Sequence, residues 1–585
     1  MPTASNGRTT VKSRTHPLLT PLLTALTALA TLLGLAIAAP TAHAADAERR
    51  PPAAASAQTT VAAMQPGWNL GNTLDSTGSD ETSWGNPRVT RELLRSIRAQ
   101  GFNSVRIPVT WSQHQGAAPS YTIDPAYLAR VREVVDWALA EGLYVLINVH
   151  HDSWQWVMNM PTQHDAVLAR FNATWTQIAN TFRGSSDRLL FESINEPFFE
   201  GSSGDAQNAQ LLHELNTAFH GIVRRSGGNN ATRVLVLPTL RTNADQARLD
   251  ELTATFTALN DPNLVATVHF YGFWPFSVNV AGYTRFDAET QRDLTDTFDR
   301  VHNAFTARGI PVIIGEYGLL GFDRHTGVIE QGEKLKFFEF LGNYARSRQL
   351  TTMLWDNGQH FNRTTLQWND PSLFRQIRSS WTTASSTAAT DQIFVRRGQT
   401  PSAATIALNL NGNTLSSVYH GSRQLVRGSD YTVSGDRLTI AGPTLARLTA
   451  SQQYGVNAVL SARFSRGVPW DLNVITYDPP TLRSATGTTN GLSIPTAFNG
   501  DQLATMQAVY PDGTFAGPHN WTSYKEFAAA FSPNYSGGEI TLPAAFFAEV
   551  RDNSTVNLTF HFWSGITVRY VLTRSGSTVT GTPAP

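Results

Sequence analysis

Two glutamates in this 585-residue sequence each end an apolar run and stand beside a turn-favouring residue. Glu196 lies between Asn195 and Pro197, and Glu316 follows Gly315. Two carboxyl groups that flank one bond can hydrolyse a glycoside, because one protonates the leaving oxygen while the other attacks the anomeric carbon. Groups about 5–5.5 Å apart give retention of configuration, and groups about 6.5–9.5 Å apart give inversion. The residue pattern predicts the pair and leaves both outcomes open.

The elements around these glutamates follow a pattern of repeated strand and helix units. Eight apolar runs are predicted strands, at residues 68–74, 104–109, 144–150, 189–195, 233–238, 265–271, 311–317 and 351–356. Amphipathic stretches such as 89–100 and 125–141 lie between them. This alternation predicts an α/β fold, a (β/α)₈ TIM barrel over residues 61–382, in which catalytic groups lie where strands end. An open doubly wound sheet is disfavoured because no G-x-G-x-x-G motif follows the first strand.

The polar residues at the predicted strand ends together resemble one known family. They are Gly67-Trp68-Asn69-Leu70-Gly71-Asn72, Arg106, His150, Asn195-Glu196-Pro197, His269-Phe270-Tyr271, Glu316 and Trp355. This set is similar to glycoside hydrolase family 5, in particular to the endoglucanases and xyloglucanases of its subfamily 4, and it spans the whole predicted barrel. The resemblance implies a retaining enzyme with Glu196 as acid/base and Glu316 as nucleophile.

The same resemblance implies roles for the neighbouring residues. Arg106 is expected to bond the nucleophile, with Tyr271 as its second hydrogen-bond partner. His269 and His150 are expected to tune the proton cycle and to orient sugar hydroxyls. Asn195 is expected to bond the sugar 2-OH, and Trp355 to form the floor under the reacting sugar. Because Glu196 must hold its proton until the leaving oxygen needs it, we expect its pKa to be raised.

Other residues of the predicted barrel rim have weaker assignments. We expect Asn72, Trp111 and Trp274 to line flanking sugar subsites, although each tryptophan could instead belong to the core. Glu192 is interpreted as a structural partner of Arg106, and His151 as a structural histidine. His150 and Asp152 could suggest a metal site, but no third ligand has suitable spacing. The predicted chemistry requires neither a metal nor a cofactor.

The composition changes after the barrel, where helices become scarce. A Ser/Thr/Ala-rich linker is predicted at 383–391, followed by β modules at 392–478 and 479–585. The first resembles the X2 immunoglobulin-like module of cellulases, interpreted as a spacer in preference to a weak polysaccharide binder. The second, with strands at 506–510, 555–562 and 567–573 and a helix at 523–531, resembles carbohydrate-binding module family 46. Trp521 and Trp563 are its candidates for stacking on sugar rings, each weighed against a role in the core.

The N-terminus has the three parts of a secretory signal. Basic residues precede an apolar stretch at 18–39, and Ala42-His43-Ala44 forms a cleavage site. We expect a signal peptide at 1–44, cleavage after Ala44, a flexible tether at 45–60 and an extracellular protein, with an uncleaved membrane anchor as the alternative. The sequence contains no cysteine, which excludes disulfides and cysteine nucleophiles.

The balance of charge bears on the partners of the protein. Basic and acidic residues number 45 each, so nucleic acid is an unexpected partner. We expect a monomer, free of the membrane after cleavage, that acts on a β-glucan such as cellulose, xyloglucan or mixed-linkage glucan. The hypothesis from a different class is a glycan-binding protein without catalytic activity.

Overall fold

The structure is a computed structural model, and it describes residues 56–584. The predicted signal peptide and most of the predicted tether lie outside the described residues. Within them, no helix combines the length and the apolar character needed to cross a bilayer.

Eight parallel strands close into a barrel in sequence order, as predicted. They are β1 (Gly67–Asn69), β2 (Ser104–Ile107), β3 (Tyr144–Asn148), β4 (Leu189–Glu192), β5 (Leu235–Pro238), β6 (Leu264–Phe270), β7 (Val312–Tyr317) and β8 (Thr351–Leu354). Each lies within or beside a predicted strand, and β1 pairs with both β2 and β8 to close the ring. Almost every strand residue is buried, as expected for parallel strands that are covered on both faces.

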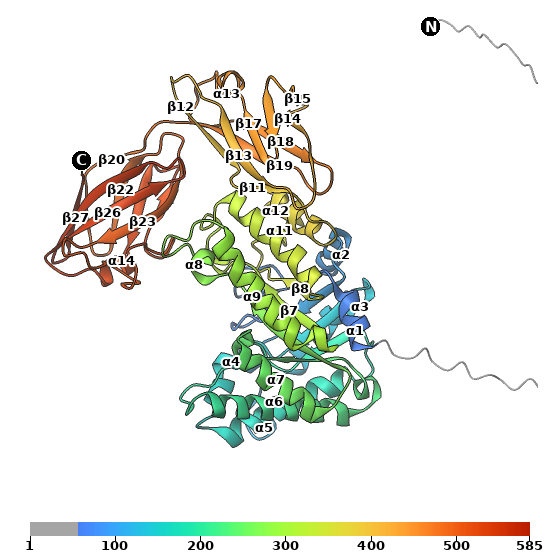
Figure 1. Cartoon of the computed structure of the whole chain (residues 1–585). Coiled ribbons are helices and arrows are strands. Elements are labelled where there is room, and N and C mark those ends of the chain that lie inside the picture. The colour runs from blue at the N-terminus through green and yellow to red at the C-terminus, as the bar shows by residue number, and fades with distance from the viewer. Residues whose placement is uncertain (1–55, 585) are drawn as a thin grey trace, which may run out of the picture. The chain divides into compact units, whose positions relative to one another are not determined.

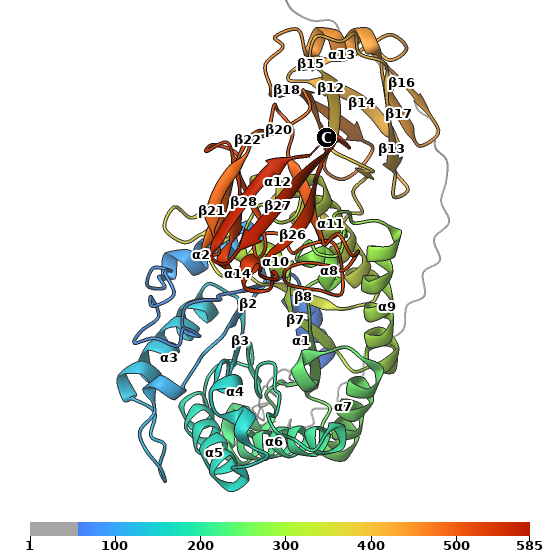
Figure 2. The same cartoon turned by 90° about the vertical axis from the view of Figure 1, so that its left-hand side faces the viewer.

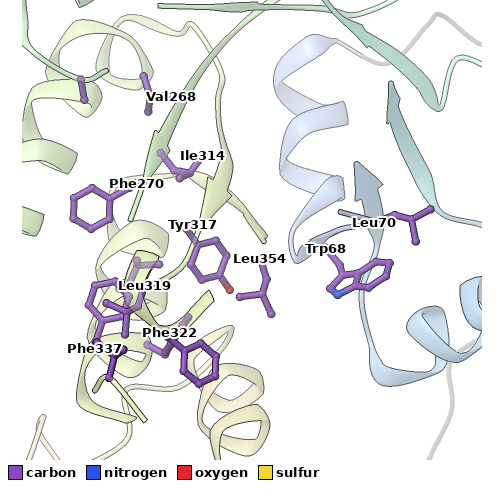
Figure 3. Close-up of a cluster of buried hydrophobic side chains, with 14 of the residues drawn as sticks. Trp68, Leu70, Val268, Phe270, Ile314, Tyr317, Leu319, Phe322, Phe337 and Leu354 are labelled. Carbon is purple, nitrogen blue, oxygen red and sulfur yellow. The ribbon is translucent and has the colours of Figure 1, made fainter. Parts of the chain in front are cut away.

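Helices surround the barrel (Figures 1 and 2). They are α2 (Arg91–Gln100), α3 (Pro125–Ala140), α4 (Asp152–Gln155), α5 (His164–Thr181), α6 (Asp205–Ser226), α7 (Gln246–Leu259), α8 (Trp274–Ser277), α9 (Ala288–Ala304), α10 (Leu320–Arg324), α11 (Gln331–Ser347) and α12 (Pro371–Ser380), with a hairpin of β9 (Phe361–Asn362) and β10 (Gln367–Trp368) before α12. Local sequence sets their ends: α2 begins after Thr90, whose hydroxyl accepts from the Leu93 N–H, and is capped after Gln100 by Gly101 with φ +106°. The helices bury one apolar face against the strands, and Figure 3 shows part of this layer, where Phe337 of α11 lies beside Phe270 of β6.

A short helix, α1 (Ala57–Met64), packs against the opposite end of the barrel from the predicted catalytic residues. Its Val61 and Met64 belong to one buried cluster with Leu146, Val236 and Met353 of the strands. Residues 57–60, which were predicted to be part of a flexible tether, therefore belong to the folded barrel.

Residues 387–477 form a β-sandwich with its own core. One sheet has β11 (Thr387–Ala388), β13 (Ala404–Asn409), β17 (Arg437–Ile440) and β16 (Tyr431–Ser434), and the other has β12 (Gln392–Arg396), β19 (Trp470–Tyr477), β18 (Gly455–Phe464), β14 (Leu415–His420) and β15 (Arg423–Gln424), with the helix α13 (Gly442–Leu448). Strand β11 lies in the predicted linker, whose Ser, Thr and Ala residues gave no strand signal.

The C-terminal module forms one nine-stranded sheet. It contains β20 (Thr481–Leu482), β21 (Ala485–Thr488), β22 (Gly491–Ala497), β23 (Leu503–Val509), β24 (Ser532–Asn534), β25 (Glu539–Pro543), β26 (Ser554–Phe562), β27 (Thr567–Ser575) and β28 (Thr578–Pro583), with one short helix, α14 (Ala544–Ala548). The predicted helix at 523–531 is wrong: this segment is irregular, and its backbone pairs instead with β23 through a bond from Ala508 N to Ser523 O.

Candidate active site

Glu196 and Glu316 meet at the carboxyl end of the barrel. Glu316 lies in β7 and is 4% exposed, whereas Glu196 follows β4 with its side chain 45% exposed. One carboxylate oxygen of each lies within 4.8 Å of the other. This separation matches the close pair of a retaining glycosidase and leaves less room than an inverting pair needs for water.

A β-bulge sets the register at this point. The pairing of β6 with β7 shifts between Val268 and His269, which places His269 opposite Glu316. Gly315 allows the close approach, because a Cβ there would lie 2.7 Å from the Thr267 hydroxyl. Close packing against β6 thus explains why a glycine precedes the predicted nucleophile.

Arg106 connects Glu316 with Glu192 and Asn195 through a buried network. Its guanidinium donates to Glu316 Oε1 at 2.6 Å, to Glu192 Oε2 at 2.7 Å and to Asn195 Oδ1 at 2.7 Å. The side chain is fully buried. Burial alone would lower the pKa of Arg106, but the two carboxylates outweigh it and raise the pKa, so the cation persists. Glu192 is therefore a buried partner of Arg106, as predicted.

The second oxygen of Glu316 accepts a hydrogen bond from the Tyr271 hydroxyl at 2.6 Å. Burial and the nearby Glu316 carboxylate raise the pKa of Tyr271 well above its ordinary value. Tyr271 therefore remains a donor, and Glu316 receives one charge-assisted bond on each oxygen. Together the two bonds fix the orientation of the Glu316 carboxylate.

Glu196 has a different environment from the one predicted. Burial acts to raise its pKa, but the hydrogen bond of 2.8 Å from His269 Nδ1, the charge of His269 and the charge of Arg106 together lower it. The predicted rise in the pKa of Glu196 is therefore wrong for the free protein. The sequence could not show that His269 would point at Glu196.

His150 offers a hydrogen-bond donor to the site. Asn148 Oδ1 accepts from the Val109 N–H, so its Nδ2 group donates to His150 Nδ1 at 3.0 Å. The remaining proton of His150 is thereby assigned to Nε2, which lies 4.0 Å from Glu316 Oε1. Burial lowers the pKa of His150 well below its ordinary value, so the ring is neutral.

The chain is similar to known proteins over most of its length. Residues 69–361 match the family described as cellulase (glycosyl hydrolase family 5). Endoglucanase B of Paenibacillus lautus is 59% identical over 528 residues, which cover 90% of this chain and 93% of that protein. The chain belongs to glycosyl hydrolase family 5.

The modules of this family 5 enzyme match as well. Residues 387–474 match carbohydrate binding domain X2, and residues 478–582 match the CBM46 carbohydrate binding domain. The full-length tri-modular endo-beta-1,4-glucanase B from Bacillus halodurans is 51% identical with a TM-score of 0.89, covering 91% of this chain and 100% of that chain. The tri-modular family 5 subfamily 4 endo-beta-1,4-glucanase from Bacillus licheniformis, complexed with cellotetraose, is 33% identical with a TM-score of 0.76, covering 91% of this chain and 100% of that chain.

A cluster of possible metal ligands lies beside the catalytic pair. Asp75, His150 and His151 each place one ligand-type atom within 4.8 Å of the others. Trp154 Nε1 donates to His151 Nδ1 at 2.8 Å, which assigns the His151 proton to Nε2, facing Asp75 at 3.4 Å. Both histidines thus present N–H groups, which suit hydrogen bonding and not metal ligation. The Asp152 carboxylate is already bonded, by the Trp111 N–H and the Trp156 indole.

The aromatic residues predicted for the subsites differ in their exposure. Trp355 stacks parallel to His150, with the ring centroids 6.1 Å apart, and Gly71 leaves room for its indole. Trp274 is 42% exposed at the start of α8. Trp111 is fully buried, and its indole donates to Asn148 O. The prediction of a subsite role for Trp111 is therefore corrected to one in the core.

Two exposed tryptophans were missed by the sequence analysis. Trp84 and Trp154 have ring centroids 5.2 Å and 5.4 Å from that of His151. Trp84 lies in the loop after β1, and Trp154 lies in α4, the short helix that follows β3, on the same side of the barrel as the glutamates. Their position directly after barrel strands was the available signal. Asn72, also after β1, has φ +54° and bonds Asp75 through its backbone N–H.

The two candidate tryptophans of the C-terminal module also differ in their surroundings. Trp521 is 56% exposed, and its ring centroid lies 6.4 Å from that of Trp274. Trp563 instead lies under the guanidinium of Arg285 from the barrel, 5.0 Å from the ring centroid. The position of Trp563 against Arg285 favours a role in the contact with the barrel.

Proposed function

We propose that this family 5 glycoside hydrolase is an endo-β-1,4-glucanase that cleaves internal bonds of β-glucans with retention. The observation that carries the proposal is the close approach of Glu196 and Glu316, within 4.8 Å between oxygens, with separate hydrogen-bond partners for each. The relatives are named as endoglucanases, one of them as an endo-beta-1,4-glucanase, which supports cleavage of β-1,4 bonds.

Glu316 is the nucleophile in the proposed mechanism. Its ionised oxygen forms a bond to the anomeric carbon while Glu196 gives its proton to the departing glycosidic oxygen. The result is a glycosyl ester on Glu316. Glu196, now a carboxylate, takes a proton from water, whose oxygen attacks the same carbon and releases Glu316. Two inversions retain the β configuration.

The other residues of the site serve this cycle. Asn195 Oδ1 is held by Arg106, which leaves the Nδ2 donors for the sugar 2-OH. The His150 Nε2 proton faces the reacting sugar, and Trp355 provides its floor. A bound sugar excludes water from the half-exposed Glu196 carboxylate, which raises its pKa and lets it arrive at the reaction protonated.

Aromatic residues extend the proposed sugar site in two directions. Trp84 and Trp154 lie beside His151 on one side, and Trp274 with Trp521 forms an exposed pair on the other. Such rings stack on the apolar faces of sugars. Cellulose, xyloglucan and mixed-linkage glucan all contain the β-1,4 linkage that the catalytic pair attacks. A side-by-side assay of the rate on each of the three polymers shows which one is preferred.

Reducing-sugar release from carboxymethyl cellulose separates an enzyme from a protein that only binds glycans. We expect Glu316→Gln to lose roughly 10³-fold or more in kcat, because an amide cannot form the glycosyl ester. Glu92→Gln, at an exposed glutamate of α2, is the matched control and should retain full activity. Equal release by the wild type and Glu316→Gln would end the enzymatic interpretation.

We further propose that the enzyme is exported and acts as a monomer away from the membrane. The signal-like N-terminal sequence supports export. The intact mass of the secreted chain tests it, and a chain that still carries residues 1–44 would contradict it.

A further inference from the structure

The loop that carries Trp521 is a tight turn between β23 and the segment that returns to it. Thr522 N donates to His519 O at 3.1 Å, which closes a turn with Trp521 near its tip. His519 has φ +57°, a left-handed conformation that costs free energy for a residue other than glycine. The turn therefore needs support from outside its own backbone.

Lys525 provides three contacts from beneath this turn. Its Nζ group donates to Pro518 O at 3.1 Å, His519 O at 3.2 Å and Thr522 O at 2.8 Å. These bonds use all three N–H groups of an ammonium ion. The residue itself is 0% exposed.

The charge of Lys525 is costly where it lies. Burial lowers its pKa to about 8, with Glu549 as an opposing influence, so the ammonium form still prevails at neutral pH. An apolar side chain of similar length would fill the same space without this desolvation cost. The three carbonyl contacts are what a lysine adds.

The segment just after Lys525 is fixed to the barrel. Phe527 N donates to Asn279 O at 3.1 Å, and Asn279 Nδ2 donates to Ala504 O at 2.9 Å. Asn279 follows α8, the short helix that begins with Trp274. Lys525 thus lies between a fixed point on the barrel and the turn that places Trp521 beside Trp274.

We propose that Lys525 is a positioning residue, whose ammonium group holds the 518–522 turn in the shape that places Trp521 against long glucans. The proposal rests on the proposed function, because it requires Trp521 to contact the polymer. Lys525 does not touch the sugar and acts only through Trp521.

The test is a double-mutant cycle in the full chain, with kcat and KM measured on a long glucan and on a short aryl cello-oligosaccharide. Lys525→Met should raise KM for the polymer roughly twofold to tenfold, as expected when one aromatic stacking contact is lost, without changing kcat on the short substrate. Trp521→Ala should give a similar increase, and the double variant should raise KM no further than Trp521→Ala alone. Lys525→Gln keeps one donor group and should raise KM for the polymer less than Lys525→Met does.

A ¹⁹F NMR spectrum of 5-fluorotryptophan-labelled protein, assigned with Trp521→Phe, reports the turn independently of activity. We expect Lys525→Met to shift or broaden the Trp521 resonance alone, while the thermal unfolding curve keeps its shape. An unchanged resonance, or an additive effect in the double variant, would overturn the positioning role. One further outcome separates the two parts of the proposal. If Trp521→Ala leaves KM for the polymer unchanged while Lys525→Met moves the Trp521 resonance, Trp521 does not contact the glucan, although Lys525 still holds the turn. If Lys525→Met does not fold, Lys525→Gln gives the same decision.

Discussion

Arg106 is the residue on which the geometry of the catalytic pair depends. It is fully buried and bonds a carboxylate on each of two strands, Glu192 of β4 and Glu316 of β7. A buried cation of this kind is stable only while every partner is present, since removal of one leaves an uncompensated charge. The same contacts fix Asn195 and set the direction of the Glu316 carboxylate.

His269 forms a hydrogen bond with Glu196, and replacement of this histidine should change the pH profile of the enzyme. Loss of the bond from His269 Nδ1 in His269→Phe removes an influence that lowers the pKa of Glu196, so that pKa should rise. The acid must be protonated to act, and therefore the alkaline limb of kcat/KM should move to higher pH while kcat falls. A pH–rate series measures both.

The control for this change is His164→Phe, which alters a histidine in α5. It should leave both limbs of the profile where they are. A limb that stays in place or moves to lower pH in His269→Phe would contradict the assigned hydrogen bond.

Helix α11 carries a buried carboxyl group that contacts the segment leading into the X2 module. Glu339 is 1% exposed and accepts from the Ser385 N–H at 2.8 Å, and burial raises its pKa to about 7. The folded chain then binds a proton that the unfolded chain has released above pH 4.5. The contribution of Glu339 to the free energy of unfolding is therefore largest below pH 4.5. It falls by about 3 kcal/mol in total as the pH rises toward 7.

Glu339→Gln should remove this dependence, because the amide oxygen still accepts from Ser385 and carries no charge. We expect the variant to unfold at a higher temperature than the wild type at pH 8, with much less gain at pH 5, in differential scanning calorimetry. Glu92→Gln serves as the exposed control. An equal difference from the wild type at both pH values would show that Glu339 does not titrate in this range.

The elements show which features the sequence could predict. The barrel strands were predictable because each apolar run ends in a polar residue that lies at the rim. Strand β11 was missed, because Thr387 and Ala388 become a strand only by pairing with β13. The 523–531 segment shows a helix-like pattern, but its buried residues face the barrel and β23. In both places the deciding contact is distant in the sequence.

The same limit applies to the site. The strand ends predicted the pair Glu196 and Glu316, and the resemblance to glycoside hydrolase family 5 implied their roles and that of Arg106. It could not separate the buried Trp111 from the exposed Trp84 and Trp154, because exposure of an indole depends on the loops that cover it. Lys525 gave no signal at all, as its partners are backbone carbonyls.

At the scale of the whole molecule, the barrel and the C-terminal module share one hydrophobic core. The same buried cluster contains Phe276 and Phe286 of the barrel together with Phe527 and Phe531 of the module. Arg285 against Trp563 and Asn279 against Ala504 add polar contacts at this junction. The module therefore belongs structurally to the catalytic unit, and the order of domains in the sequence did not predict this.

The central claim is that Glu316 forms a covalent bond with the sugar while Glu196 moves the proton. Inactivation with a 2-deoxy-2-fluoro-β-cellobioside that carries a good leaving group, followed by peptide mass spectrometry, tests this most directly. The account predicts one adduct per chain, on the peptide that contains Glu316, with activity lost in proportion. An adduct on Glu196, or inactivation with no adduct on Glu316, would contradict it.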